Sequence, residues 1–351
     1  MAHLVADLTA PVDPVEALRR VGFLLERNRA SSYRVEAFRK AATTLKELPD
    51  QELAQRHRAG TLQELPGIGK ATAAVVSEAL DGQVPTYLAS LQESHNGALT
   101  QDGQELFAAL RGDCHSHSNW SDGGSPIDEM VLAAMETGHE WLVLTDHSPR
   151  LKIANGLSVA RLRRQIEIVD AITASLGGAF TLLKGIEVDI LDDGSLDQTP
   201  EMLDQLDVVV ASVHSRLRMN AAPMTRRMVS AVQNPRVNVL GHCTGRLVTG
   251  GRGTRPQSEF DAEAVFAACL ENNVAVEINA RPERCDPPDD LLQLAVEMGC
   301  LFSIDSDAHA PGQLDFPAYG AARAAAFGIE PERIVTTWEV DEVKTWARGE
   351  R

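Results

Sequence analysis

The sequence predicts an α/β fold, a distorted, incomplete (β/α)7 barrel that follows a small all-α domain. From residue 105 to the end, short apolar runs rich in β-branched residues alternate with helix-like segments, which favours a parallel sheet. Each apolar run ends in a polar side chain, most often one that can bind a metal ion. Since the carboxyl ends of barrel strands meet at one face, we expect a single site there.

The first expected strand carries His115 and His117. Side chains at i and i+2 of a strand point to the same side, so both imidazoles can reach one ion. The later runs, with the polar residues that follow them, are 141–145 before Asp146 and His147, 180–186 before Glu187, 208–213 before His214, 237–241 before His242, 274–278 before Asn279 and 301–306 before Asp307 and His309. The helix-like segments between them are 126–138, 159–176, 224–233, 261–272 and 289–298.

Histidines concentrate at these strand ends. A lone histidine there is usually a hydrogen-bonded barrel residue, but of the ten histidines only four lie outside the pattern, namely His3, His57, His95 and His139. A structural role alone does not predict this distribution. Mixed imidazole and carboxylate ligands suit zinc, manganese or iron.

These motifs resemble the polymerase-and-histidinol-phosphatase (PHP) superfamily. The resemblance covers about residues 105–351 and rests on His115-Ser116-His117, Ser121-Asp122-Gly123, Thr145-Asp146-His147-Ser148, Gly185-Ile186-Glu187, Ser212-Val213-His214-Ser215, Gly241-His242, Ile278-Asn279-Ala280 and Asp307-Ala308-His309. More narrowly, the amino-acid sequences of residues 224–227, 241–246 and 277–280 are similar to those in the PHP domain of bacterial family X DNA polymerases. Cys243 stands where a proline is usual in that family.

The resemblance implies nine ligands for three divalent ions. Glu187 would bridge a first ion, held by His115, His117 and Asp307, to a second, held by His214 and His242. Asp122, His147 and His309 would hold the third.

Clustered divalent ions favour phosphate ester hydrolysis, because they ionise a water near neutral pH and bind the attacking and leaving oxygens. We expect Glu187, Asp307, Arg246 and Arg284 to act in catalysis, the arginines by pairing with phosphate oxygens. Arg216 and Arg218 also follow ligand strands. We find no Gly-x-Ser-x-Gly elbow, and the five cysteines have neither metal nor disulfide spacing.

The first hundred residues predict a separate helical domain, with amphipathic segments at 14–27, 34–46, 50–59 and 70–80. The run Leu65-Pro66-Gly67-Ile68-Gly69-Lys70 resembles a helix-hairpin-helix motif, and residues 13–91 resemble the N-terminal DNA-binding domain of family X polymerases. Backbone amides at such a helix start can hold a phosphate. The candidate DNA contacts are Gly67, Gly69, Lys70 and Lys40.

We therefore expect a flexible N-terminus at 1–12, the DNA-binding domain at 13–92, a linker at 93–104 and the PHP domain at 105–351. The linker leaves no room for a polymerase core. Net charge is −17, but residues 1–100 hold 11 basic against 12 acidic side chains. This near-neutral domain predicts modest, salt-sensitive, sequence-independent DNA affinity. No segment predicts a signal peptide or a membrane span, so we expect a cytoplasmic protein, and a monomer.

Three functions remain open. The leading hypothesis is a metal-dependent 3′ to 5′ DNA exonuclease or 3′-end processing enzyme in DNA repair. The second is a phosphatase of a small metabolite, of the histidinol-phosphate kind. The third, a DNA-binding scaffold with an inert barrel, conflicts with a full set of ligand residues.

Overall fold

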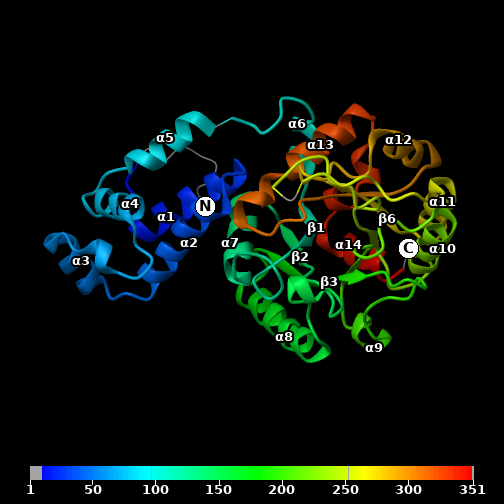
Figure 1. Ribbon diagram of the computed structural model, residues 1–351, viewed down its shortest axis with the longest axis horizontal. Coiled ribbons are helices and arrows are strands. Elements are labelled where there is room, and N and C mark those ends of the chain that lie inside the picture. Colours follow the sequence, from blue (N-terminus) through cyan, green and yellow to red (C-terminus); the bar gives the residue numbers. More distant parts are fainter. Residues whose placement is uncertain (1–9, 96, 252, 350–351) are drawn as a thin grey trace. The chain divides into compact units, whose positions relative to one another are not determined.

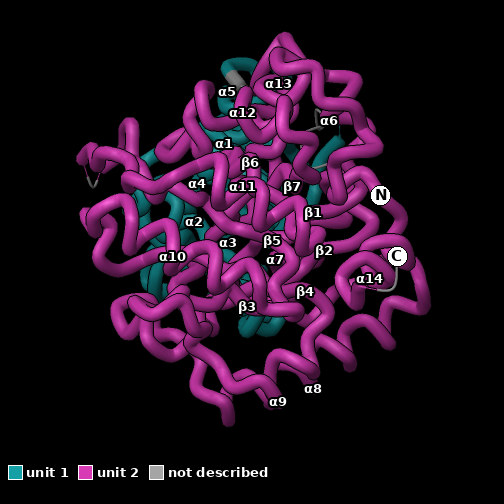
Figure 2. Tube along the Cα trace, turned by 90° about the vertical axis from the view of Figure 1, so that its right-hand side faces the viewer, with its two compact units in different colours: residues 1–98 teal, residues 99–351 magenta. Residues whose placement is uncertain are grey.

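The computed structural model describes residues 10–95, 97–251 and 253–349. Most of the N-terminus expected to be flexible, residues 1–9, lies outside this range. The chain forms two compact units, Met1–Ala98 and Leu99–Arg351, which Figure 2 colours separately.

Unit 1 is entirely helical where it is described. Its elements are α1 Pro14–Arg27, α2 Ser32–Lys46, α3 Asp50–Ala59, a short 3-10 turn Leu62–Glu64, α4 Lys70–Leu80 and α5 Thr86–His95. The first four α-helices match the expected segments closely, but α5 was not expected and continues into the proposed linker.

Helix α1 forms the centre of unit 1. The Asp13 carboxylate accepts the backbone N–H groups of Val15 at 2.9 Å and Glu16 at 3.1 Å, which satisfies amides at the helix start. Along the helix, Leu18, Val21 and Leu25 recur at helical spacing and are almost fully buried. The apolar face of α1 therefore anchors the small core of this unit.

Unit 2 contains one sheet of seven parallel strands in sequence order. The strands are β1 Gly112–Ser116, β2 Trp141–Leu144, β3 Thr181–Asp189, β4 Val208–Ser212, β5 Val239–Leu240, β6 Ala275–Asn279 and β7 Phe302–Asp305. A bridge between Ser116 and Ala308 brings β7 back to β1, and His117 N–H donates to Ala308 O at 2.8 Å. The expected incomplete α/β barrel is confirmed.

Helices surround these strands (Figure 1). They are α6 Gln104–Ala109, α7 Ile127–Glu136, α8 Val159–Ser175, α9 Pro200–Leu203, α10 Ala221–Val232, α11 Ala262–Glu271, α12 Asp289–Met298, α13 Pro317–Ala326 and α14 Val340–Ala347. The five expected from periodicity are present, whereas α6, α9, α13 and α14 were not expected. Short 3-10 turns lie at Lys152–Ala154, Pro311–Asp315, Pro331–Arg333 and Val335–Thr337.

The C-terminal segment packs at the amino end of the barrel. Trp141, at the start of β2, donates its indole N–H to Trp338 O at 3.1 Å. Trp346 of α14 stacks edge-on against Trp338 and donates to Asn273 O at 2.9 Å. With this end filled by aromatic side chains, the polar residues at the strands' carboxyl ends face the opposite end.

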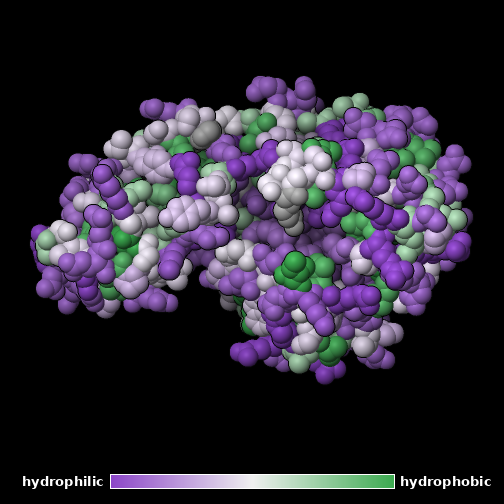
Figure 3. Space-filling model, in the orientation of Figure 1, coloured by the Kyte–Doolittle hydropathy of each residue, from purple (hydrophilic) through white to green (hydrophobic). Residues whose placement is uncertain are grey.

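The visible surface is mainly hydrophilic, with small, separate hydrophobic groups (Figure 3). None of the described helices combines the length and the apolarity needed to cross a bilayer. The cytoplasmic location and monomeric state expected from the sequence stay predictions.

Candidate metal centre

The nine expected ligands come together at the carboxyl end of the barrel. They lie near the carboxyl ends of strands β1, β2, β3, β4, β5 and β7 or just after them, except for Asp122, which lies on the loop after β1. Most are buried; Asp122 alone has an exposed side chain. Their convergence follows from the parallel sheet, because every strand delivers its terminal residue to the same edge.

Glu187 lies at the centre of the cluster. Its Oε2 atom faces His115 Nε2 at 3.4 Å, His117 Nε2 at 3.6 Å and His147 Nδ1 at 2.8 Å. Its Oε1 atom faces His214 Nε2 at 3.2 Å and His242 Nε2 at 2.9 Å. One carboxylate thus contacts histidines on two sides, which is the geometry of a bridging ligand.

Three groups of potential ligand atoms lie within bonding reach of one ion each. They are His115, His117 and Asp307; His147, Glu187 and His214; and His117, Asp122, His147 and His309. The first corresponds to the expected first ion. His117 and His147 each belong to two groups, and His242 contacts Glu187 at 2.9 Å. The expected allocation of the nine ligands to three ions stays a prediction.

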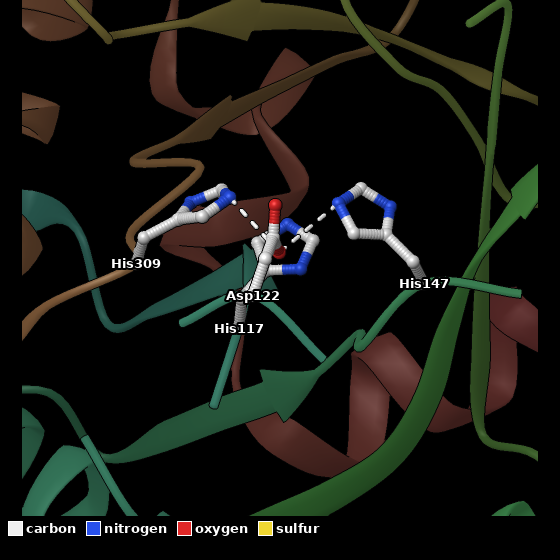
Figure 4. Close-up of side chains that lie close together, drawn as sticks. All are labelled: His117, Asp122, His147 and His309. Carbon is white, nitrogen blue, oxygen red and sulfur yellow. Dashed lines mark ion pairs between the residues drawn. The ribbon is translucent and has the colours of Figure 1, made fainter. Parts of the chain in front are cut away.

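Figure 4 shows the third group, with Asp122 between His147 and His309. Asp122 Oδ1 lies 3.3 Å from His147 Nε2 and 3.4 Å from His309 Nε2. The His117 ring stacks at a tilt against the His309 ring, with 4.2 Å between centroids. Ligand-type atoms of all four side chains thus converge closely enough to hold one ion.

The donor atoms fit divalent cations. His115 Nε2, His117 Nε2 and His214 Nε2 are buried and have no hydrogen-bond partner among the described residues. An unsatisfied buried polar atom is costly, and a cation bound by these nitrogens would remove that cost. Imidazole and carboxylate donors suit zinc, manganese or iron.

Electrostatics keep the central carboxylate ionised. Burial raises the pKa of Glu187, but the charges of His214, His115 and His147 outweigh burial and hold the pKa well below its usual value. Burial, together with the neighbouring His309 and His147, lowers the pKa of His117 well below normal. Ionised Glu187 and neutral His117 are thus in the protonation state that binds metal, whereas the histidines whose charges hold Glu187 ionised would each release a proton on metal binding.

Buried acids hold the ligands in position, and sequence reasoning missed them. His115 Nδ1 contacts Glu277 Oε1 at 2.6 Å, and His214 Nδ1 contacts Asp189 Oδ1 at 2.8 Å. These contacts fix the ring orientation and the tautomer that leaves Nε2 for a metal. For Asp189 a signal existed, since it lies two residues after Glu187 on the same strand.

Asp146 performs a similar role for the loop that carries Asp122. Its carboxylate accepts Ser118 N–H at 2.9 Å, Ser118 Oγ–H at 2.6 Å and Gln165 Nε2–H at 2.6 Å, and it also accepts the Ser121 hydroxyl. The carboxylate therefore ties the Ser121-Asp122-Gly123 loop to β2.

The comparison with protein families assigns a known domain type to each unit. Residues 12–84 match the helix-hairpin-helix domain, and residues 113–281 match the PHP domain. The chain is a PHP-domain protein with a helix-hairpin-helix domain. This confirms the family expected from the motifs. The PHP match ends at residue 281, whereas the barrel continues through β7, which brings Asp307 and His309 to the same site.

Named relatives point in two directions. The chain is 35% identical over 239 residues to the Bacillus subtilis DNA polymerase/3′-5′ exonuclease PolX, a match that covers 68% of this chain and 41% of that protein. It is 27% identical over 213 residues to a probable phosphatase from Caldicellulosiruptor saccharolyticus, covering 58% of this chain and 81% of the relative. The chain thus spans less than half the length of the Bacillus protein.

A solved structure is also similar. It is a histidinol phosphate phosphatase from Lactococcus lactis, crystallised with zinc, L-histidinol and phosphate, with a TM-score of 0.47 and 18% identity over 63% of this chain and 95% of that one. The PHP domain and the relatives named as phosphatases support the expected enzyme class, a metal-dependent hydrolase of phosphate esters.

A cavity of about 450 Å³ opens onto the expected metal ligands at the carboxyl end of the barrel. Arg284 lines it and donates its Nε–H to Asp307 Oδ2 at 2.9 Å. Arg281, which sequence reasoning missed, also lines the cavity and lies 3.1 Å from His309 Nδ1. Its position two residues after Asn279, at the end of β6, was the signal that could have identified it.

The structure does not bring Arg246 to this cavity. Its Nε–H donates to the carbonyls of Arg284 and Cys285, both at 3.1 Å. Its guanidinium therefore supports the backbone of the Arg284 loop, and the expected catalytic role of Arg246 stays a prediction. Arg216 pairs with Asp192 at 3.0 Å instead of lining the cavity.

The expected DNA contacts of the hairpin lie on the surface of unit 1. Gly67 has a φ of +77°, and a Cβ there would lie 2.9 Å from Lys40 Cγ. Gly67 is thus required by backbone conformation and by the packing of the Lys40 stem. Gly69 precedes α4, whose first residue is Lys70, and all four residues are exposed.

Proposed function

We propose that this chain is a metal-dependent 3′ to 5′ exonuclease or 3′-end processing phosphoesterase that acts on DNA. The observation that carries the proposal is the presence, in one chain, of a helix-hairpin-helix domain and a cluster of imidazoles and carboxylates around Glu187. The relative named as a 3′-5′ exonuclease supports the same substrate. DNA binding by the hairpin would be independent of sequence and of modest affinity.

Up to three divalent ions, zinc, manganese or iron, held by the nine residues would supply an ionised water and polarise the phosphate. Arg281 and Arg284 orient the scissile phosphate by donating N–H groups to its oxygens. The water oxygen bonds to phosphorus, the P–O3′ bond breaks, and O3′ leaves with a proton. The products are a shortened strand with a 3′ hydroxyl and a 5′-monophosphate.

The test is a manganese-supplemented assay of the full chain on primers labelled at the 3′ or the 5′ end, beside p-nitrophenyl phosphate. A ladder that shortens from the 3′ end and disappears with Asp307→Ala is expected. Asp307 contacts both His117 and Arg284, so its loss removes one ligand and releases an arginine. Phosphate release from the small ester without any primer shortening would refute the proposal.

That outcome would favour the second candidate, a phosphatase of small monoesters. Relatives named as probable phosphatases favour it, because one of them is matched over 81% of its length.

A matched pair of variants tests the hairpin. Gly67→Ala and Gly82→Ala both place alanine at a positive φ, +77° and +73°, but only the first displaces Lys40. Both should lose about 1 to 2 kcal/mol of local stability from the left-handed backbone. We expect Gly67→Ala alone to weaken turnover of DNA while sparing p-nitrophenyl phosphate. An equal effect on both substrates would argue against DNA binding by this turn.

A further inference from the structure

Four arginines line the cavity above the candidate metal ligands, although unit 2 is strongly acidic. They are Arg218, Arg255, Arg281 and Arg284. The inner pair contacts Asp307, Arg284 at 2.9 Å and Arg281 at 3.5 Å. These two lie beside the ligands and suit the phosphate that reacts.

One positively charged side chain in the outer part of the cavity has no partner among the described residues. Arg218 is exposed and lies four residues after the ligand His214. Among the described residues, none forms a hydrogen bond or an ion pair with its side chain, whereas Arg216 nearby pairs with Asp192. Arg255 is held by Gly245 O at 2.7 Å. Arg218 is therefore the arginine of this cavity that can turn toward a substrate.

Ile153 lines the same cavity and is 95% exposed. It lies in the short turn Lys152–Ala154 between β2 and α8. An isoleucine this exposed contributes almost no burial to the fold, and among the large hydrophobic side chains of the described residues it is the most exposed. An exposed apolar side chain and an exposed arginine that line one cavity suit a ligand with an apolar part and an anionic part, as a nucleotide has.

The inference rests on the proposed function and concerns which part of the DNA end lies here. When the terminal nucleotide is removed, the scissile phosphate is the last one of the strand. A further phosphate exists only on the upstream side. We propose that Arg218 and Ile153 form a subsite for the nucleotide that precedes the one removed, in which Arg218 pairs with that nucleotide's 5′ phosphate and Ile153 lies against its base.

The subsite distinguishes polynucleotide ends from monoesters. A small phosphorylated metabolite offers one phosphate, which the metal cluster and the inner arginines would take, and nothing for Arg218. A strand end offers a second phosphate and a base. The preferred substrate is thus a strand end with at least two nucleotides and a phosphate on the upstream one.

Two dinucleotides test the arginine, thymidylyl-thymidine with and without a 5′ phosphate. Wild-type protein should cleave the 5′-phosphorylated form with a kcat/KM at least about tenfold higher, the order expected for a charge-assisted hydrogen bond. Arg218→Gln should bring this ratio close to one. The matched control is Arg163→Gln, an exposed arginine of α8 that does not line the cavity, and it should keep the wild-type ratio.

The isoleucine is tested by removing the upstream base. Replacing that nucleotide by an abasic one should lower kcat/KM several-fold in wild-type protein but hardly at all in Ile153→Ser. Leu270→Ser, at a half-exposed leucine of α11, is the control and should behave as wild type. A binding readout accompanies these rates: the salt dependence of oligonucleotide affinity should weaken by about 0.7 in slope with Arg218→Gln, because one single-strand phosphate contact is lost.

The outcomes separate the two proposals. If wild-type protein cleaves neither dinucleotide nor a longer primer, the proposed function is wrong, and the proposed subsite is wrong as well. If it cleaves primers from the 3′ end but the 5′ phosphate gives no advantage, or Arg218→Gln retains that advantage, the subsite alone is wrong.

Discussion

Glu277 contacts two of the candidate metal ligands. Its Oε1 atom lies 2.6 Å from His115 Nδ1, and its Oε2 atom accepts the backbone N–H of His242 and lies 3.2 Å from Asn279 Nδ2. The residue is completely buried. It therefore fixes one imidazole directly and the backbone of another ligand through a hydrogen bond.

Glu277→Gln keeps the shape of this side chain and removes its charge. A neutral amide makes His115 a weaker base, so we expect metal affinity to fall about 10- to 100-fold while the fold persists. Competition with a fluorescent chelator measures the affinity, and circular dichroism checks the fold. The control is Glu271→Gln on the exposed side of α11, which should bind as wild type. Unchanged affinity in Glu277→Gln would show that this contact is not important for metal binding.

Individual residues also show what sequence could and could not predict. Most of the expected ligand histidines were identifiable because they follow apolar runs, and His115 and His117 because they alternate on one expected strand; both patterns are visible locally. Glu277 was not, since it is one polar position inside an expected strand and its partner His115 lies 162 residues away. The arginines were harder to place for a related reason, because position after a strand does not determine whether a long side chain turns to the cavity, as Arg281 does, or to a carbonyl, as Arg246 does.

Among secondary-structure elements, those with a strong local pattern were predicted best. Buried parallel strands appear as short runs of apolar residues, and all seven were located within a few residues of their observed bounds. Helix α14 was missed because Val340–Ala347 has only eight residues, too few for a clear helical period. The contribution of α14 to stability depends on its packing at the amino end of the barrel.

Trp346 makes the importance of α14 testable. It is 2% exposed and packs among the side chains at the amino end of the strands, including Trp338. Trp346→Ala removes this volume and the hydrogen bond to Asn273 O, and should lower the free energy of unfolding by about 3 to 5 kcal/mol. Urea unfolding of the full chain measures the change. Thr345→Ala, one residue earlier and exposed, should cost little, and equal losses in both variants would contradict a specific packing role.

At the scale of the whole molecule, the negative charge is concentrated in one unit. Residues 99–351 hold 38 acidic against 22 basic side chains, whereas residues 1–98 are nearly balanced. The three groups of potential metal ligands all lie in unit 2. Bound cations would offset part of its charge and bind only the folded state, so metal removal should lower the thermal stability of unit 2 and leave that of unit 1 unchanged.

The effect of metal removal should also depend on pH. Burial lowers the pKa of His147, but the charge of Glu187 and the contact with Asp122 outweigh burial and raise the pKa to about 10. In the metal-free protein this raised pKa stabilises the fold fully below the ordinary pKa of histidine, near 6.5, and the contribution is lost as pH rises through about 10. A cation must displace the same proton, so metal affinity should rise up to about tenfold per pH unit over this window.

The gap in melting temperature between metal-loaded and chelated protein should therefore widen from pH 6.5 to pH 9. Scanning calorimetry at several pH values measures it, with the unit 1 transition as an internal control. Proton release can be followed separately by titrating metal in two buffers of different ionisation enthalpy. His147→Gln cannot hold the proton, so it should release one proton fewer and show a shallower pH dependence. A gap that stays constant or narrows as pH rises would mean that His147 is already neutral in the metal-free centre.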